Sequence, residues 1–279
     1  MIPLHHPEAK QLEAKMIPPG VNTAIIIGHP AHGLRVHRFL EIYKPFFYII
    51  TDGSGSSGNS KVKNAVDIIE NCAAKASPVM CRFSDAEMYR IIKEYDTETL
   101  TKLVDEIVAD LERNDIDLVV GDAAEGFNPT HDLCRYLVNA VVKIYGTKKS
   151  GNIGNFDFLL HGPPGFCPPE VKDESIRIEL NKEDFGRKMS SIRNYPDIAV
   201  DIEHAFRNYG ETAFQSECLR PVKHPNQYTA WDTDMPYYES YGSKRVKEGV
   251  YSDVISFEQH LLPLAKYLTK YADDASLSG

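Results

Sequence analysis

Short apolar runs alternate with amphipathic stretches along the first 160 residues of the chain. Five of these runs predict strands, because a short continuous apolar run is typical of a strand buried on both faces of a sheet. The runs lie at Thr23–Gly28, Phe46–Thr51, Val79–Arg82, Ile116–Val120 and Asn155–Leu160.

Helices are expected between these strands. Apolar residues recur every three or four positions over 62–69, 100–111 and 133–141, which places them on one face of a helix. A further helix should begin at Pro30, because proline is favoured at the first helical position. Strands that alternate with helices predict parallel βαβ units with right-handed crossovers.

The second half of the chain is rich in proline and aromatic residues and contains two helical segments, at about 182–208 and 252–271. We expect it to cover one end of the sheet. The fold class is therefore α/β, a single domain (1–279) with a Rossmann-like, doubly wound, mostly parallel sheet. Its expected parts are an N-terminal extension (1–20), a core (21–165) and a C-terminal irregular and helical cover (166–279) that contributes to the substrate pocket.

Composition and charge narrow the expected partners. The net charge is −9 and the lysines are scattered, whereas nucleic-acid binding needs clustered Lys and Arg. The sequence shows neither a signal peptide nor the apolar stretch of about 18 residues that a membrane span needs. Five cysteines without a CxxC pair favour a reducing compartment. We expect a cytoplasmic protein with a small-molecule substrate, and homo-oligomerisation stays open.

Two similar tetrapeptides follow predicted strands. His29-Pro30-Ala31-His32 follows the first strand, and Asn128-Pro129-Thr130-His131 follows the fourth. In doubly wound sheets these two strands flank the point where strand order reverses, and ligands bind in the crevice outside it. His29, His32 and His131 are therefore expected to meet there. Three histidines with an open fourth position form the usual catalytic zinc arrangement.

Each histidine also has an ordinary structural interpretation. A lone histidine at a helix start is usually a cap or a surface residue, and it is the repeated Pro-x-His spacing that favours a metal site. Cys134 could be a soft ligand, but its place on an apolar stripe indicates a buried structural thiol. Five other histidines have no partner pattern and receive no role: His37, His161, His204, His224 and His260.

Three carboxylates lie near the expected site. Asp52 ends the second strand, and Asp122 and Glu125 lie between the fourth strand and its helix. Any of them could take a proton from activated water or hold a ligand histidine in place. A rival signal is the loop Gly53-Ser-Gly-Ser-Ser-Gly58, which matches GxGxxG but follows the second strand and has Asn59 where a P-loop has lysine. A flexible loop is the simpler interpretation.

At these motifs the chain resembles the PIG-L/LmbE-like zinc-dependent N-deacetylases. That family has AHPDDE after its first strand, Thr-x-Gly after its second and HPDH after a later one. Here the matching segments are GHPAHG (28–33), TDG (51–53) and NPTH (128–131), and the continuation through NFDFLLHGPP is similar to a divergent bacterial branch. The resemblance covers about the first 160 residues.

The resemblance implies a role for each matching position. His29 and His131 correspond to metal-binding histidines, and the metal-binding aspartate falls on His32. The general base of the family falls on Ala31, which cannot accept a proton, so the base would have to be relocated. Glu125 is the first candidate for that base, followed by Asp122 and Asp52.

The leading hypothesis is a metal-dependent amide hydrolase of the deacetylase type. His29, His32 and His131 would hold a divalent ion, with zinc the expected one, and the substrate would be an N-acylated, sugar-like molecule. Two alternatives stay open. Ala31 favours a non-catalytic metal- and sugar-binding protein on the same fold, and the glycine loop favours a nucleotide-binding enzyme.

Overall fold

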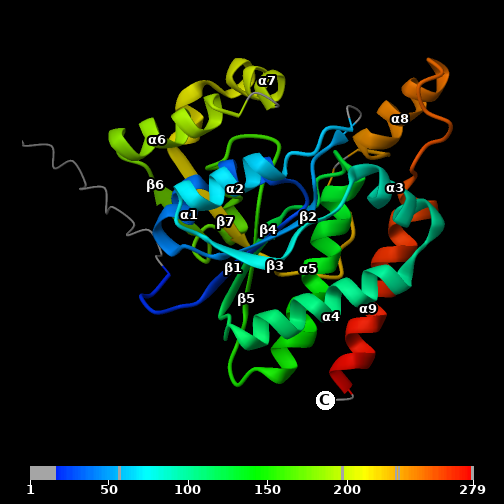
Figure 1. The fold of residues 1–279 in the computed structure, drawn as a ribbon, viewed down its shortest axis with the longest axis horizontal. Helices are drawn as coiled ribbons and strands as arrows, with labels where there is room; N and C mark the ends of the chain where they lie inside the picture. Colours follow the sequence, from blue (N-terminus) through cyan, green and yellow to red (C-terminus); the bar gives the residue numbers. More distant parts are fainter. Residues whose placement is uncertain (1–16, 56–57, 196–197, 230, 232, 278–279) are drawn as a thin grey trace, which may run out of the picture.

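The five predicted strands form most of one seven-stranded sheet in the computed structural model (Figure 1). The structure describes residues 17–55, 58–195, 198–229, 231 and 233–277. Residues 1–16 of the predicted N-terminal extension and Ser56 and Ser57 of the glycine loop lie outside the described residues.

The strand order is β3-β2-β1-β4-β5-β7-β6. All neighbours pair in parallel except β7, which is antiparallel to both β5 and β6. The order reverses between β1 and β4, as predicted, so the doubly wound α/β class is confirmed. The strands are β1 (Thr23–Ile27), β2 (Phe46–Thr51), β3 (Lys75–Phe83), β4 (Leu118–Asp122), β5 (Gly154–Phe158), β6 (Ile176–Glu179) and β7 (Ser216–Pro221).

Helices pack on both faces of the sheet because the central strands are apolar on both faces. In β1, Ala24 and Ile26 join a core with helices α3, α4, α5 and α9, while Ile25 and Ile27 join a second core with α1, α2 and α6. The helices are α1 (His37–Tyr43), α2 (Val62–Asn71), α3 (Asp85–Glu94), α4 (Thr97–Arg113), α5 (Pro129–Lys148), α6 (Lys182–Arg193), α7 (Ala199–Tyr209), α8 (Tyr237–Lys247) and α9 (Leu262–Leu277).

The structure also contains short 3-10 and π-helical turns. The helix predicted from Pro30 begins as the 3-10 helix η1 (Pro30–Val36) and continues as α1. The described part of the chain also has the 3-10 helices η3 (Pro169–Val171) and η5 (Glu211–Gln215) and the π-helical turn η6 (Phe257–Leu261), which leads into α9. No helix within the described ranges is long and apolar enough to span a membrane.

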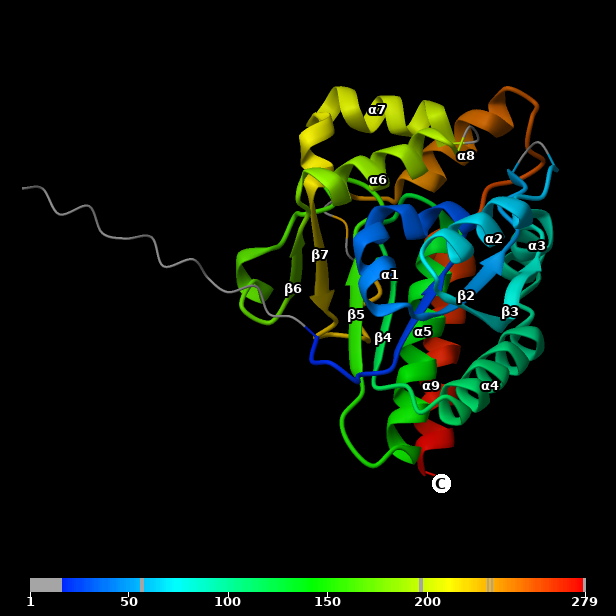
Figure 2. The ribbon, with the colours of Figure 1, turned by 60° about the vertical axis from the view of Figure 1, so that its left-hand side comes forward.

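The second half differs in detail from the prediction. It supplies two strands, β6 and β7, that widen the sheet, and the segment 182–208 is two helices, α6 and α7. The sequence places Pro196 between them, and proline lacks the N–H that a continuous helix needs. The helix expected at 252–271 corresponds to η6 and α9, which together begin at Phe257 and end at Leu277. Helix α8 was not predicted, and neither was α3 in the first half of the chain. Figure 2 shows α6, α7 and α8 together at one end of the molecule, opposite the C-terminal end of α9.

Candidate metal centre

The structure brings His29, His32 and His131 together at the carboxyl edge of β1 and β4. Their ring centroids are 4.4–5.0 Å apart, and one potential ligand atom from each ring lies within 4.8 Å of the others. His29 precedes η1, His32 lies inside it, and His131 lies in the first turn of α5. The reversal of strand order therefore places these side chains where the sequence predicted them.

The start of α5 shows why His131 is held in place. Asn128 caps the helix by accepting a hydrogen bond from the Thr130 N–H at 2.8 Å, and Pro129 occupies the first helical turn. Cys134, one turn further on, is buried and directs its Sγ towards the carbonyl oxygen of Ile26. This environment agrees with the interpretation of Cys134 as a structural thiol.

The donor set fits a zinc-sized cation. His29 Nδ1 and His131 Nε2 face each other at 2.9 Å. Around tetrahedral zinc, with Zn–N bonds of about 2.0–2.1 Å, two ligand nitrogens lie about 3.3 Å apart, so a small adjustment would admit the ion. Neutral imidazole nitrogens are also ligands that zinc prefers.

Burial keeps the rings of His32 and His131 neutral. Burial lowers the pKa of His131 well below its ordinary value, and the neighbouring His32 and His29 lower it further. Burial also lowers the pKa of His32, although Asp122 partly opposes the shift. A neutral ring has a lone pair to offer, so both residues are in the form that binds a metal.

Asp122 orients one of the rings. Its Oδ2 accepts a hydrogen bond from the Gly28 N–H at 2.7 Å and lies 2.8 Å from His32 Nδ1. A Cβ at Gly28 would lie only 3.2 Å from this same oxygen, so glycine permits the close approach. With Nδ1 directed at Asp122, His32 keeps Nε2 for a ligand.

Asp85 plays the same part for His29, and it was not among the residues predicted from the sequence. Its Oδ1 lies 3.1 Å from His29 Nε2, while its Oδ2 accepts the Gly55 N–H at 2.7 Å. Burial alone would raise the pKa of Asp85, but the bonds from His29, Thr51 and Gly55 lower it to about 2. The sequence signal that could have located Asp85 is Ser84-x-x-Glu87, a capping box that predicts a helix start at this position. In the structure, this helix is α3 and begins directly after β3.

The other two predicted carboxylates bind backbone groups. Glu125 accepts the Leu160 N–H at 2.7 Å and the His161 N–H at 3.2 Å, and so holds the loop after β5. Asp52 accepts the Ser54 N–H at 2.9 Å at the start of the glycine loop. The Gly55 N–H in that loop is already bonded to Asp85, which removes one donor that a nucleotide phosphate would use.

The buried environment of Glu125 leads to a prediction about stability. Burial raises its pKa to about 7, although the N–H groups of Leu160 and His161 and the charges of Arg35 and Arg220 oppose the shift. Because the pKa of Glu125 is higher in the folded protein than in the unfolded chain, its protonated carboxyl group stabilises the fold. This contribution to the free energy of unfolding is complete below about pH 4.5 and is lost as the pH rises through 7.

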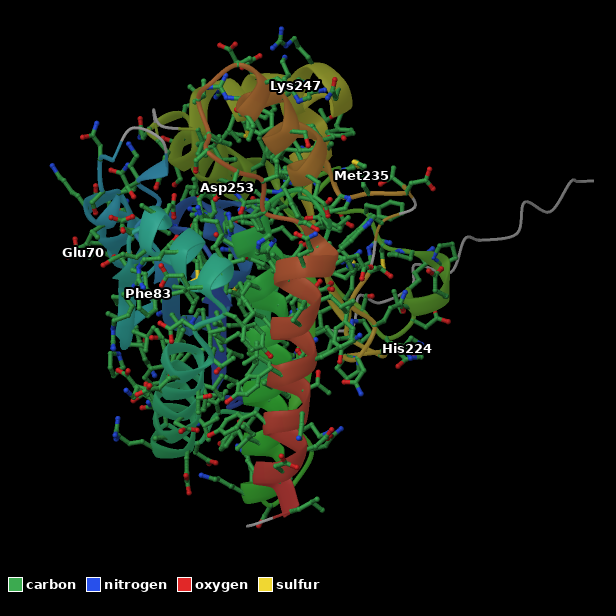
Figure 3. All side chains as sticks on the ribbon, turned by 90° about the vertical axis from the view of Figure 1, so that its right-hand side faces the viewer. Glu70, Phe83, His224, Met235, Lys247 and Asp253 are labelled. Carbon is green, nitrogen blue, oxygen red and sulfur yellow. The ribbon has the colours of Figure 1, made fainter. Side chains whose placement is uncertain are left out.

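The variant Glu125→Gln removes this titration. The fall in the free energy of unfolding between pH 5 and pH 8.5 should be about 2–3 kcal/mol smaller in the variant than in the unaltered protein. Urea denaturation at the two pH values measures it. Glu70→Gln, at an exposed position of α2 (Figure 3), is the control and should behave like the unaltered protein. An equal pH dependence in Glu125→Gln would contradict the raised pKa.

Comparisons with known proteins give a likeness of fold. No protein-family model and no curated protein matches the sequence. Among solved structures, the zinc-inhibited form of teicoplanin deacetylase Orf2 is 13% identical with a TM-score of 0.45, covering 72% of this chain and 99% of that one. A deacetylase–bog complex from the teicoplanin biosynthesis pathway is 14% identical with a TM-score of 0.47, again covering 72% and 99%. This likeness is too low to assign an activity, so the function has to be argued from the chemistry of the site.

Proposed function

We propose that this protein is a metal-dependent hydrolase of the PIG-L/LmbE deacetylase type, acting on the amide of an N-acylated, sugar-like small molecule. The observation that carries the proposal is the convergence of three partly buried histidine rings, two of them oriented by carboxylates, at the strand-order reversal. The pattern is that of a metal site with oriented ligands and is not typical of surface histidines.

Each ring has a defined part in this proposal. His29 binds through Nδ1 because its Nε2 faces Asp85, and His32 binds through Nε2 because its Nδ1 faces Asp122. His131 contributes Nε2, the atom that faces His29. A zinc ion held by these atoms would supply Lewis-acid chemistry that activates water and polarises the amide carbonyl.

Glu125 is the proposed general base. A relocated base is needed because Ala31, which cannot accept a proton, occupies the position of the base in the deacetylase family that the sequence resembles. A pKa of about 7 suits a group that accepts a proton near neutral pH. Its oxygens accept backbone N–H groups but keep further lone pairs. Asp122 is the alternative, since its Oδ1 is buried and has no hydrogen-bond partner. Asp52 is the third candidate.

The test combines metal analysis with an acetate-release assay on N-acetylated sugars. We expect about one equivalent of zinc per chain and acetate release that is lost on chelation and restored by zinc. Glu125→Gln should retain the metal and lose about 10²–10⁴-fold in kcat. A protein that binds no divalent ion, or whose activity survives complete removal of the metal, would disprove the proposal.

A second candidate function is metal and ligand binding without catalysis, which the loss of a base at Ala31 specifically favours. In that case the protein would contain stoichiometric zinc and bind N-acetylated sugars, but no acetate would appear during prolonged incubation. The same assay therefore separates the two functions.

A further inference from the structure

A cavity of about 520 Å³ opens at the first turn of α5, the turn that carries His131. Its walls come from α3, the loop and first turn of α5, helix α8 and the segment 250–255 that follows it. Figure 1 shows α3 and α8 side by side at the edge of the molecule, and Figure 3 places Asp253 on the chain between α8 and α9. A cavity of this volume can hold a small organic ligand.

Two connections join the cavity to the metal centre. Tyr89 lines the cavity and lies one helical turn after Asp85, whose carboxylate contacts His29. Asn128 also lines it and caps the helix that carries His131. A ligand in the cavity would therefore have one end close to the histidines.

The wall nearest the start of α5 is a row of stacked aromatic rings. Phe127 and Tyr237 have centroids 4.7 Å apart with planes 10° from parallel, and Tyr237 and Tyr241 have centroids 5.8 Å apart at 24°. Phe127 also contacts the ring of His161 at a centroid distance of 3.4 Å, and the ring centroids of His161 and His131 are 6.4 Å apart. The row thus runs from the metal centre along the cavity.

These rings are unusually exposed for their size. Phe127, Tyr237 and Tyr241 are 40%, 50% and 42% exposed, and Tyr251 across the cavity is 39% exposed. Exposed apolar patches of this kind mark binding sites. A planar ring of a ligand can pack against the exposed edges of these rings, in the edge-to-face geometry that aromatic pairs also prefer.

The charged and amide side chains of the cavity already have partners. Lys93 Nζ binds Asp253 at 3.1 Å, and Asn128 is used as a helix cap. The other polar groups of the lining are the hydroxyls of five tyrosines and of Ser252, and the Tyr238 hydroxyl is buried without a hydrogen-bond partner among the described residues. These hydroxyls can meet polar groups of a ligand, while the aromatic rings that make up most of the wall favour a flat ring beside them.

We propose that this cavity binds a planar aromatic group of the substrate, with its amide directed at the three histidines. The substrate class is then an N-acylated aromatic amine or an aromatic derivative of an N-acylated compound. The position of the amide rests on the function proposed above, whereas the preference for an aromatic ring rests on the cavity alone.

The test compares two acetamides of matched size. Dissociation constants of acetanilide and N-cyclohexylacetamide are measured by ligand-observed NMR, on zinc-loaded and on chelator-treated protein. We expect acetanilide to bind about two- to tenfold more tightly, since an aromatic pair adds about that factor to simple burial. N-acetylglucosamine, as the third ligand, should bind more weakly than acetanilide.

Tyr237→Leu keeps an apolar side chain but removes the most exposed aromatic ring of the row. It should bring the ratio of the two dissociation constants to about one without changing zinc content. Phe166→Leu is the control, because Phe166 is also 50% exposed but lies outside the cavity lining, and its ratio should stay unchanged.

The outcomes separate the two proposals. Equal binding of the two acetamides, or tighter binding of N-acetylglucosamine, overturns the aromatic site even if acetate is released from N-acetylated sugars. A preference for acetanilide that is lost in Tyr237→Leu supports the aromatic site even if no turnover occurs, in which case the hydrolase proposal fails alone.

Discussion

His131→Ala is expected to lose its stoichiometric metal and, with it, hydrolysis of the substrate. His131 lies in the first turn of α5, and its Nε2 faces His29 Nδ1 at 2.9 Å, so its removal opens one side of the proposed donor set. The loss of metal affinity should exceed about 100-fold, because even the groups that only orient a ligand contribute about 10–100-fold. Equilibrium dialysis with zinc measures the affinity, and acetate release measures activity.

Two further variants are expected to have smaller effects on zinc affinity than His131→Ala. Asp85→Asn keeps all three histidines and should weaken zinc binding by about 10–100-fold, since only the orientation of His29 is disturbed. His204→Ala removes an exposed histidine of α7 and should bind zinc like the unaltered protein. If His131→Ala kept the metal while remaining folded by circular dichroism, the proposed ligand set would be wrong.

The meeting of His29 and His131, 102 positions apart, could be predicted because it depends on topology. Apolar runs identified β1 and β4, and the rule that parallel strands end at one edge placed the residues after them side by side. Pro30 and Pro129 fixed where the helical turns begin. The apolar runs and the two prolines were enough to predict this meeting, because each of them determines the path of the backbone.

Asp85 could not be found in the same way because its contact depends on the exact path of β3. The pairing of β2 and β3 contains register shifts. Strand β3 also has several exposed residues, so it is not a continuous buried apolar run like β1. A bulged strand moves the residues beyond it by distances that hydropathy does not record. The role of Asp85 is therefore a property of the folded sheet.

The antiparallel strand β7 was missed for a different reason, which involves a buried charge. Glu217 is the second residue of β7 and is 0% exposed, as is Lys188 of α6. Charged residues are rarely buried unless they are paired, so a pattern that contains them does not indicate a central strand. The strand is explained only by the partners that the fold brings to Glu217.

Those partners link three elements. Glu217 accepts the N–H groups of Arg38 and Phe39 in the first turn of α1, each at 2.9 Å, and Lys188 Nζ binds Glu217 at 2.8 Å. Lys188 also donates to the carbonyl oxygen of Arg35 at 2.8 Å. The Glu217 carboxylate thus caps α1, which directly follows the turn η1 that contains His32. The Lys188 ammonium group balances the charge of this carboxylate.

Lys188→Met is therefore expected to lower the free energy of unfolding by about 3–5 kcal/mol, because it leaves the Glu217 carboxylate buried without a counter-charge. Chemical denaturation at neutral pH measures the change, and Lys182→Met, at an exposed position of the same helix, should change stability by less than about 0.5 kcal/mol. Adding Glu217→Gln to Lys188→Met removes the unpaired charge and should restore part of the loss. If the double variant were as unstable as the sum of the two single variants, lost packing would explain the effect and the ion pair would not.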